Sequence, residues 1–206
     1  AQVVAAVILV NLGGEGAAAE PSRPVRIVAF GDSLTAGLGV AQRDAFPEQL
    51  QRALKAKGVV AEVINAGVSG DTSGAALQRL DWAVPEGADA VIVELGANDA
   101  LRGIDPKVTR AALEKIVARL KDKGLAVLIA GMKAPRNWGD AYAREFDDIY
   151  PELAEASGAL LYPFFLDGVA LSTELNQPDG MHPTAKGVAV VVERMLPKVE
   201  ELIGRV

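Results

Sequence analysis

Cysteine is absent from the 206-residue sequence, and histidine occurs only once, as His182. Without cysteine the chain has no disulfide bond, no thiol nucleophile and no thiolate metal site. A single imidazole also excludes the zinc sites that depend on several histidines. We therefore expect no metal and no organic cofactor. Any chemistry has to use serine, carboxylate, amide, lysine and one imidazole.

Aromatic and basic side chains are also scarce. Aromatic residues make up 5% of the sequence, too few for a surface on which nucleic-acid bases stack. Aspartate and glutamate outnumber lysine and arginine by 27 to 21, which gives a net charge of −6. A phosphate backbone calls for clustered lysine and arginine. We therefore expect no nucleic-acid partner.

The N-terminal segment resembles the remnant of a secretion signal. Residues 3–10, "VVAAVILV", are wholly apolar, and three small residues follow at 17–19. The run has the length of a signal-peptide core, lacks a basic segment before it, and is too short to span a bilayer. Residues 1–19 are expected to be a signal remnant or a flexible tail, or else a first strand, and no integral membrane span is expected. A signal remnant implies a periplasmic or secreted protein, whereas a mere tail implies a cytoplasmic one.

The rest of the chain, residues 20–206, is expected to form one domain in which strands and helices alternate. Buried strands are predicted within 25–30, 59–67, 88–96, 125–131 and 159–165, and helices within 45–58, 72–84, 106–123, 140–156 and 183–196. Pro197 is expected to kink or interrupt the last helix. Five such alternations are typical of an α/β fold with a parallel sheet and helices on both of its faces.

Distinctive polar residues follow the predicted strands. Ser33 follows the first strand, Gly70 the second, Asn98 the third, and Asp179 with His182 the fifth. In an open parallel sheet, ligands bind outside the carboxyl ends of the strands, so these residues are expected to lie close together. Together they offer a hydroxyl, backbone N–H groups, an amide, a carboxylate and an imidazole, which is the inventory of a serine hydrolase.

Each residue type suits one step of acyl transfer. The Ser33 hydroxyl needs a base to become a nucleophile, and His182 is the only imidazole available. Asp179, three residues earlier, can hold the other ring nitrogen. The oxyanion needs donors, for which the N–H groups of Ser33 and Gly70 and the amide of Asn98 are the candidates. Gly70 lacks a Cβ, so its backbone can approach the substrate closely.

Every one of these residues also has a simpler interpretation when it is considered alone. Ser33 can cap a turn, Gly70 can be an ordinary turn glycine, and Asn98 an ordinary loop residue. Asp179 begins a common turn dipeptide, and His182 can be a structural residue ahead of a helix. Only their joint placement at one edge of the sheet favours a catalytic role.

Four segments in order resemble the GDSL (SGNH) hydrolase family. They are "GDSL" at 31–34, "GVSGDTS" at 67–73, "GAND" at 96–99 and "DGMH" at 179–182. The stretches "NAGVSGDTS", "ELGAND" and "LRG" are most similar to its bacterial arylesterase, thioesterase and lysophospholipase branch. "GDSL" lacks the second glycine of the G-x-S-x-G elbow of α/β-hydrolases.

The resemblance implies a three-layer α/β/α sandwich around a five-stranded parallel sheet, like that of flavodoxin. It implies Ser33 as nucleophile, His182 as base and Asp179 as its carboxylate, with Ser33, Gly70 and Asn98 as oxyanion donors. Asp32 is interpreted as support for the loop. The implied activity is that of a serine esterase on small acyl or aryl esters, with thioesters and lysophospholipids as further candidates.

Two alternatives to this activity remain. A carbohydrate-ester deacetylase or an acyltransferase uses the same triad. The other alternative is a non-catalytic, doubly wound binding module of the flavodoxin type, although the sequence has no P-loop. The loop 132–140, with Trp138, is a candidate pocket lining or else a plain surface loop. Phe164 and Phe165 are more readily explained by core packing than by a pocket wall. The oligomeric state is not indicated.

Overall fold

The computed structural model describes residues 23–206, so the expectation for residues 1–19 lies outside the described part of the chain. Five parallel strands form one sheet in the order β2-β1-β3-β4-β5. Their bounds are β1 Val25–Gly31, β2 Ala61–Gly67, β3 Ala90–Glu94, β4 Ala126–Ala130 and β5 Leu160–Tyr162. All five lie within the predicted ranges or extend them by one residue.

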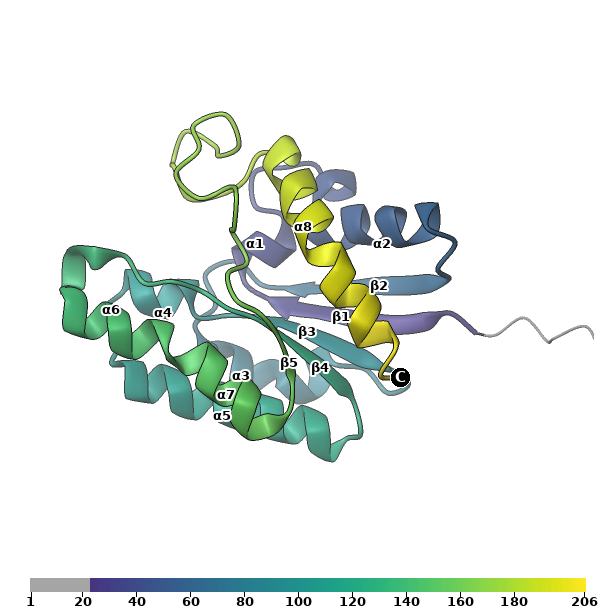
Figure 1. Cartoon of the computed structure of the whole chain (residues 1–206), viewed down its shortest axis with the longest axis horizontal. Helices are drawn as coiled ribbons and strands as arrows, with labels where there is room; N and C mark the ends of the chain where they lie inside the picture. Colours follow the sequence, from purple (N-terminus) through teal and green to yellow (C-terminus); the bar gives the residue numbers. More distant parts are fainter. Residues whose placement is uncertain (1–22) are drawn as a thin grey trace, which may run out of the picture.

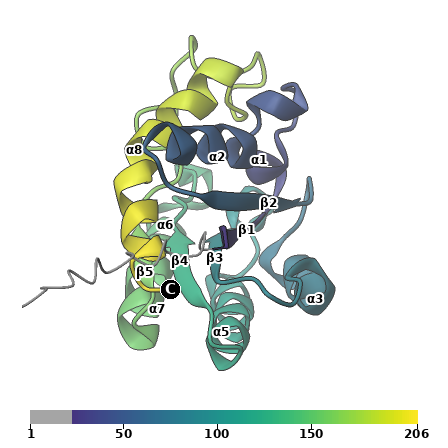
Figure 2. The same ribbon diagram turned by 90° about the vertical axis from the view of Figure 1, so that its right-hand side faces the viewer.

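Helices cover both faces of this sheet and give three layers (Figures 1 and 2). The bounds of the longer helices are α2 Phe46–Ala56, α3 Ser73–Ala83, α5 Pro106–Asp122, α6 Asp140–Asp147, α7 Ile149–Ser157 and α8 Ala185–Ile203. Two short helices, α1 Ser33–Ala36 and α4 Ala97–Leu101, follow β1 and β3 directly. Helices α2 and α8 lie on one face, and α3, α5 and α7 on the other, so the predicted α/β/α sandwich is confirmed.

The central strands explain why the sheet is covered on both sides. Every residue of β3 is buried, and β1 is buried from Ile27 onward. A strand that is apolar on both faces needs a helix layer on each. Helix α5 supplies part of one layer: Asp105 caps its first turn by accepting from the N–H of Lys107, and its apolar stripe is buried.

Two predicted helices differ from those observed. The segment 140–156 forms two helices, α6 and α7, rather than one. Helix α8 begins at Ala185 instead of residue 183, because Thr184 caps it by accepting from the N–H of Gly187. The predicted interruption at Pro197 was wrong, since α8 continues through it to Ile203. Val199 and Leu202 are fully buried beyond the proline, and this packing outweighs the lost backbone hydrogen bond.

The strand order places a crevice beside the end of β1. The chain proceeds from β1 outward to β2, then crosses back to β3 on the other side of β1. The two loops after β1 and β3 therefore diverge to opposite faces, and ligands bind at such a switch point. Ser33 lies two residues beyond the last residue of β1. Across residues 23–206, no helix combines the length and apolar character needed to cross a membrane.

Candidate active site

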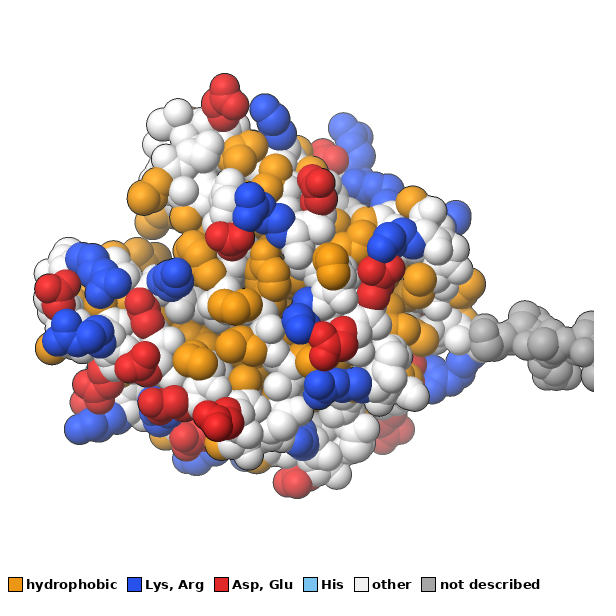
Figure 3. Space-filling model, viewed as in Figure 1, with side chains coloured by type: hydrophobic (Ala, Val, Ile, Leu, Met, Phe, Trp, Pro, Cys, Tyr) orange, Lys and Arg blue, Asp and Glu red, His pale blue; other side chains and the backbone are white. Residues whose placement is uncertain are grey.

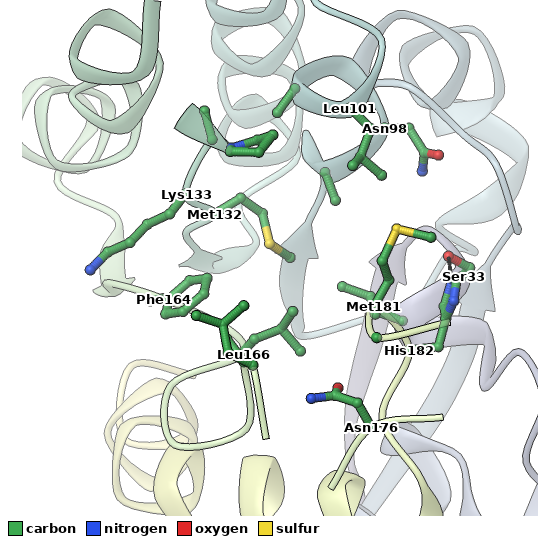
Figure 4. Close-up of a pocket in the computed structure, with 18 of the residues that line it drawn as sticks. Ser33, Asn98, Leu101, Met132, Lys133, Phe164, Leu166, Asn176, Met181 and His182 are labelled. Carbon is green, nitrogen blue, oxygen red and sulfur yellow. Dashed lines mark hydrogen bonds between the residues drawn. The ribbon is translucent and has the colours of Figure 1, made fainter. Parts of the chain in front are cut away.

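The nucleophile candidate and the only histidine, 149 positions apart in sequence, meet at the carboxyl edge of the sheet (Figure 4). Ser33 is the first residue of α1, and its hydroxyl oxygen lies 2.9 Å from Nε2 of His182. Asp32 caps this helix by accepting from the N–H of Leu34, which confirms its interpretation as support for the loop. The serine hydroxyl is thus within hydrogen-bond reach of a base.

Asp179 holds the other side of the imidazole, as expected from its position three residues earlier. Its Oδ2 lies 2.7 Å from Nδ1 of His182, and its Oδ1 accepts from the backbone N–H groups of His182 and Met181. These two backbone bonds and the bond from the imidazole lower the pKa of Asp179 to about 2. Gln177 ties this turn to the first loop by donating to the Leu38 carbonyl.

Two of the predicted oxyanion donors have free backbone N–H groups at the pocket. Gly70 has a positive φ of 85°, a conformation that favours glycine, and lines the pocket together with Ser33. Within residues 23–206, neither the Ser33 N–H nor the Gly70 N–H donates to a backbone or side-chain acceptor. Unpaired donors at a partly enclosed site suit a developing negative charge.

Asn98, the third predicted donor, lines the same pocket but is already hydrogen-bonded. It sits on α4, which begins after the left-handed Gly96. Its Nδ2 donates to Oδ2 of Asp32 at 3.1 Å and to the Asp71 carbonyl at 3.0 Å. The structure therefore brings all five predicted residues together, with the Asn98 amide held by two acceptors that the sequence analysis did not identify.

Arg79 is a structural support that the sequence analysis missed. It donates to the Asp71 carboxylate and to the carbonyls of Ala66 and Gly31, and it lies over the ring of Phe30. It thereby joins the loop after β2 to the ends of β1 and β2. The available signal was a charged residue on the apolar stripe of α3, next to the buried Leu80.

Buried carboxylates beneath the loops were missed as well. Glu94, the last residue of β3, is fully buried, and burial together with the nearby Asp32 raises its pKa well above the ordinary value. Burial also raises the pKa of Asp32 to about 6. Asp99 accepts from the backbone and hydroxyl of Ser73 and from the Thr109 hydroxyl. The sequence feature that could have revealed Glu94 is an acidic residue at the end of an otherwise apolar strand.

An apolar pocket of about 750 Å³ extends from Ser33 and His182. Met132, Phe164 and Leu166 line its far end (Figure 4). Figure 3 shows hydrophobic side chains in the hollow between the loop before α8 and the end of the molecule that carries α6. The pocket suits an acyl chain better than a polar ligand.

The two pocket segments named in the sequence analysis contribute in part. Residues 132–136 line the pocket, but Trp138 does not; its indole N–H donates to the Ala100 carbonyl. Phe164 is a pocket wall, contrary to expectation, whereas Phe165 is buried in the core against Phe46. Within residues 23–206, no cluster of three or more histidine, aspartate or glutamate side chains is arranged to hold a metal ion.

The fold and the geometry of this site are typical of a family of hydrolases. Residues 29–190 match the profile described as the GDSL-like Lipase/Acylhydrolase family. The chain belongs to this family, which confirms the resemblance in its sequence.

Its relatives are named esterases. An arylesterase of Vibrio mimicus is 39% identical over 82% of this chain and 84% of its own length. Esterase TesA of Pseudomonas aeruginosa is 34% identical over 86% of this chain and 89% of its own. The thioesterase 1/protease 1/lysophospholipase L1 of Escherichia coli K12 is 34% identical, with shares of 86% and 85%.

Solved structures agree with these relatives. The SGNH-hydrolase family esterase AlinE4 is 44% identical, with a TM-score of 0.75 over 88% of this chain and 98% of that one. The crystal structure of TesA is 33% identical, with a TM-score of 0.81 over 86% and 99%.

Proposed function

We propose that this protein is a serine esterase that hydrolyses acyl or aryl carboxylic esters through an acyl-serine intermediate. One observation carries the proposal: an unbroken hydrogen-bonded series from Ser33 through His182 to Asp179 at one end of an apolar pocket. The family and the esterase relatives support the same activity.

Acylation follows from the arrangement of the three side chains. His182 Nε2 accepts the Ser33 proton while Oγ attacks the ester carbonyl carbon. Asp179 keeps the proton of the imidazole on Nδ1, so Nε2 is the free base, and it stabilises the imidazolium that forms. The carbonyl oxygen becomes an oxyanion, for which Ser33, Gly70 and Asn98 are the donors. The imidazolium then protonates the leaving alkoxide or phenoxide, and the acyl group remains on Ser33.

Deacylation repeats the same proton transfers with water. His182 removes a proton from a water molecule, whose oxygen attacks the acyl-serine carbonyl. A second oxyanion forms at the same donors, and the proton returns to Ser33 as the free acid leaves. Both half-reactions use side chains and water only, so the proposed mechanism has no metal or organic cofactor.

The pocket supports a substrate with an apolar acyl or aryl group. Met132 and Phe164 lie away from Ser33, where a chain bound to the carbonyl carbon extends. Small acyl and aryl esters are the primary substrate class, with thioesters and lysophospholipids as further candidates, in keeping with the names of the relatives. The apolar lining favours these over the acetylated sugars of a carbohydrate-ester deacetylase. The signal-like pattern of residues 3–19 supports export to the periplasm or beyond.

Phosphonate labelling combined with a matched pair of serine variants tests the proposal. An alkyl fluorophosphonate is expected to add to Ser33 of the wild type, with a mass shift in the peptide that contains it. Ser33→Ala should lose the label and reduce kcat for an aryl acetate on the order of 10⁶-fold, as removal of a triad nucleophile does. Ser157→Ala, at the remote end of α7, is the control. Turnover by Ser33→Ala at the rate of the control would refute the nucleophile.

A further inference from the structure

Two buried acidic residues, Asp32 and Glu94, are linked by a hydrogen bond at the turn that carries Ser33. Asp32 follows β1 and Glu94 ends β3, and both side chains are 0% exposed. The backbone N–H of Asp32 donates to Oε2 of Glu94 at 3.3 Å. Burial disfavours the charged form of each carboxyl, and the charge of Asp32 further raises the pKa of Glu94, so we expect only one of the two to be ionised at neutral pH.

The hydrogen bonds indicate which carboxyl holds the proton. Both oxygens of Asp32 accept: Oδ1 from the Leu34 N–H and Oδ2 from the Asn98 amide. A proton on Asp32 would face one of these donors. Oε2 of Glu94 also accepts, from the Thr35 hydroxyl at 2.7 Å and from Asp32, but Oε1 is buried with no partner among residues 23–206. Only Oε1 of Glu94 takes a proton without opposing a donor.

We propose that Asp32 and Glu94 form a one-proton positioning pair, in which neutral Glu94 lets Asp32 remain the anion that holds the Asn98 amide in place as an oxyanion donor. This inference rests on the proposed esterase mechanism. It assigns Asp32 a function beyond capping α1, because Asp32 acts on the reaction through Asn98 rather than by touching the substrate.

Without such a partner, the side-chain amide of an asparagine can take either of two orientations. Its oxygen and its NH₂ have nearly the same shape, and a rotation of 180° would turn an acceptor toward the oxyanion. The Asp32 carboxylate and the Asp71 carbonyl are both acceptors, so together they hold the NH₂ on the side they face. One N–H of the amide stays on the Asp32 carboxylate, and the other passes from the Asp71 carbonyl to the oxyanion as the negative charge develops, so only one hydrogen bond is exchanged.

The charged and titratable groups around the pair come from four elements. His182 from the loop before α8 lowers the pKa of Asp32, Asp71 from the loop after β2 raises it, and Tyr150 of α7 lies near both carboxyls. Arg79 of α3 pairs with Asp71 and so offsets that charge. Burial is the largest influence and raises the pKa of Asp32 to about 6, whereas burial and the charge of Asp32 raise the pKa of Glu94 well above its ordinary value.

A double-mutant cycle distinguishes positioning from a general structural effect. Asp32→Asn keeps the shape of the side chain but turns an N–H toward either Leu34 or Asn98. We therefore expect kcat for an aryl acetate to fall roughly tenfold to a hundredfold, which is no more than the loss of a whole oxyanion donor. KM should change little. In an Asn98→Ala background the same substitution should cost less than about threefold, because the residue through which it acts is gone. Equal losses in both backgrounds, or an Asp32→Asn enzyme as active as the wild type, would overturn the inference.

Glu94 and the pH profile give a second, independent readout. Glu94→Gln is neutral and retains an acceptor for Thr35, so it is expected to keep kcat within about threefold, whereas Glu94→Leu removes the acceptor and should lose tenfold or more. Below pH about 6, Asp32 takes up a proton. In that range the plot of log(kcat/KM) against pH should therefore be one unit steeper for the wild type than for Asp32→Asn.

Opposite results would refute the pair without touching the esterase assignment. An equal loss in Glu94→Gln and Glu94→Leu would mean that Glu94 acts as an anion. Parallel pH profiles would mean that Asp32 does not titrate in this range. Ser33→Ala distinguishes a failure of the esterase assignment from a failure of the positioning pair. If Ser33→Ala is inactive and unlabelled while Asp32→Asn behaves as wild type, only the positioning pair is refuted.

Discussion

Arg79 and Asp71 form a nearly buried ion pair, with Nε of the arginine 2.5 Å from Oδ2 of the aspartate and side-chain exposures of 8% and 12%. The remaining guanidinium donors bind the carbonyls of Ala66 and Gly31. One side chain therefore ties the loop that carries Gly70 to the end of β1, two residues before Ser33. The pair is a structural base for the proposed oxyanion donors rather than part of the proposed chemistry.

Replacing this arginine should therefore damage both stability and activity. Arg79→Met leaves Asp71 and two carbonyls without their donor, and breaking a buried pair from one side costs about 3–5 kcal/mol. We expect that loss in the free energy of unfolding by urea, together with a lower kcat, because the Asp71 carbonyl also holds Asn98. Arg119→Met is the control, since its pair with Asp81 is exposed and contributes less than about 1 kcal/mol. Similar losses in the two variants would contradict this role.

The raised pKa of Asp32 predicts a stability that falls as the pH rises. The folded protein holds the Asp32 proton up to pH about 6, while the unfolded chain releases it near 3.8. Between those values the folded state binds more protons, so the unfolding free energy declines by about 3 kcal/mol and then levels off. Asp32→Asn should lack this contribution, of which about 2 kcal/mol falls between pH 4.5 and 7, the two values at which urea unfolding is measured. Glu94 contributes a slope of the same sign in both proteins.

An exposed carboxylate provides the comparison for that experiment. Asp122→Asn, at the end of α5, should retain the wild-type decline between the two pH values. If Asp32→Asn and Asp122→Asn follow the same curve as the wild type, Asp32 is not the group that titrates.

The meeting of Ser33 with His182 was predictable because it depends on topology. Parallel strands end at one edge of the sheet, so the loops after the first, third and fifth strands converge whatever their individual conformations. Predicting the proposed triad required no knowledge of side-chain packing, since Asp179 lies three residues from His182 and shares its turn.

The supports beneath the site were not predictable for the opposite reason. Whether Arg79 or Glu94 turns inward depends on which carbonyls and hydroxyls other elements present to it, and those partners are far away in sequence. The end of α8 shows the same limit, because tertiary packing of Val199 and Leu202 overrides the local effect of Pro197.

Phe164 and Phe165 offer a matched pair that separates binding from stability. Phe165 is 1% exposed and packs edge-on against Phe46, so Phe165→Ala should lower the unfolding free energy by about 3–5 kcal/mol. Phe164 lines the pocket, so Phe164→Ala should leave stability within about 1 kcal/mol and lower kcat/KM for a long-chain ester at least tenfold. The ratio of octanoate to acetate hydrolysis measures this effect. An unchanged ratio in Phe164→Ala would remove this residue from the acyl site.

Leu171 lines the pocket in a backbone conformation that destabilises the folded chain. Its side chain is 94% exposed and its φ is +66°, a left-handed conformation that disfavours leucine. Asparagine tolerates this conformation, so Leu171→Asn should keep or slightly raise the unfolding free energy. Because Leu171 lines the pocket, the same variant should raise KM for long-chain esters several-fold while acetate esters are unaffected. Strain that persists at an exposed apolar residue is expected where the residue serves a site. A variant that is less stable and binds octanoate esters normally would show that Leu171 serves the fold instead.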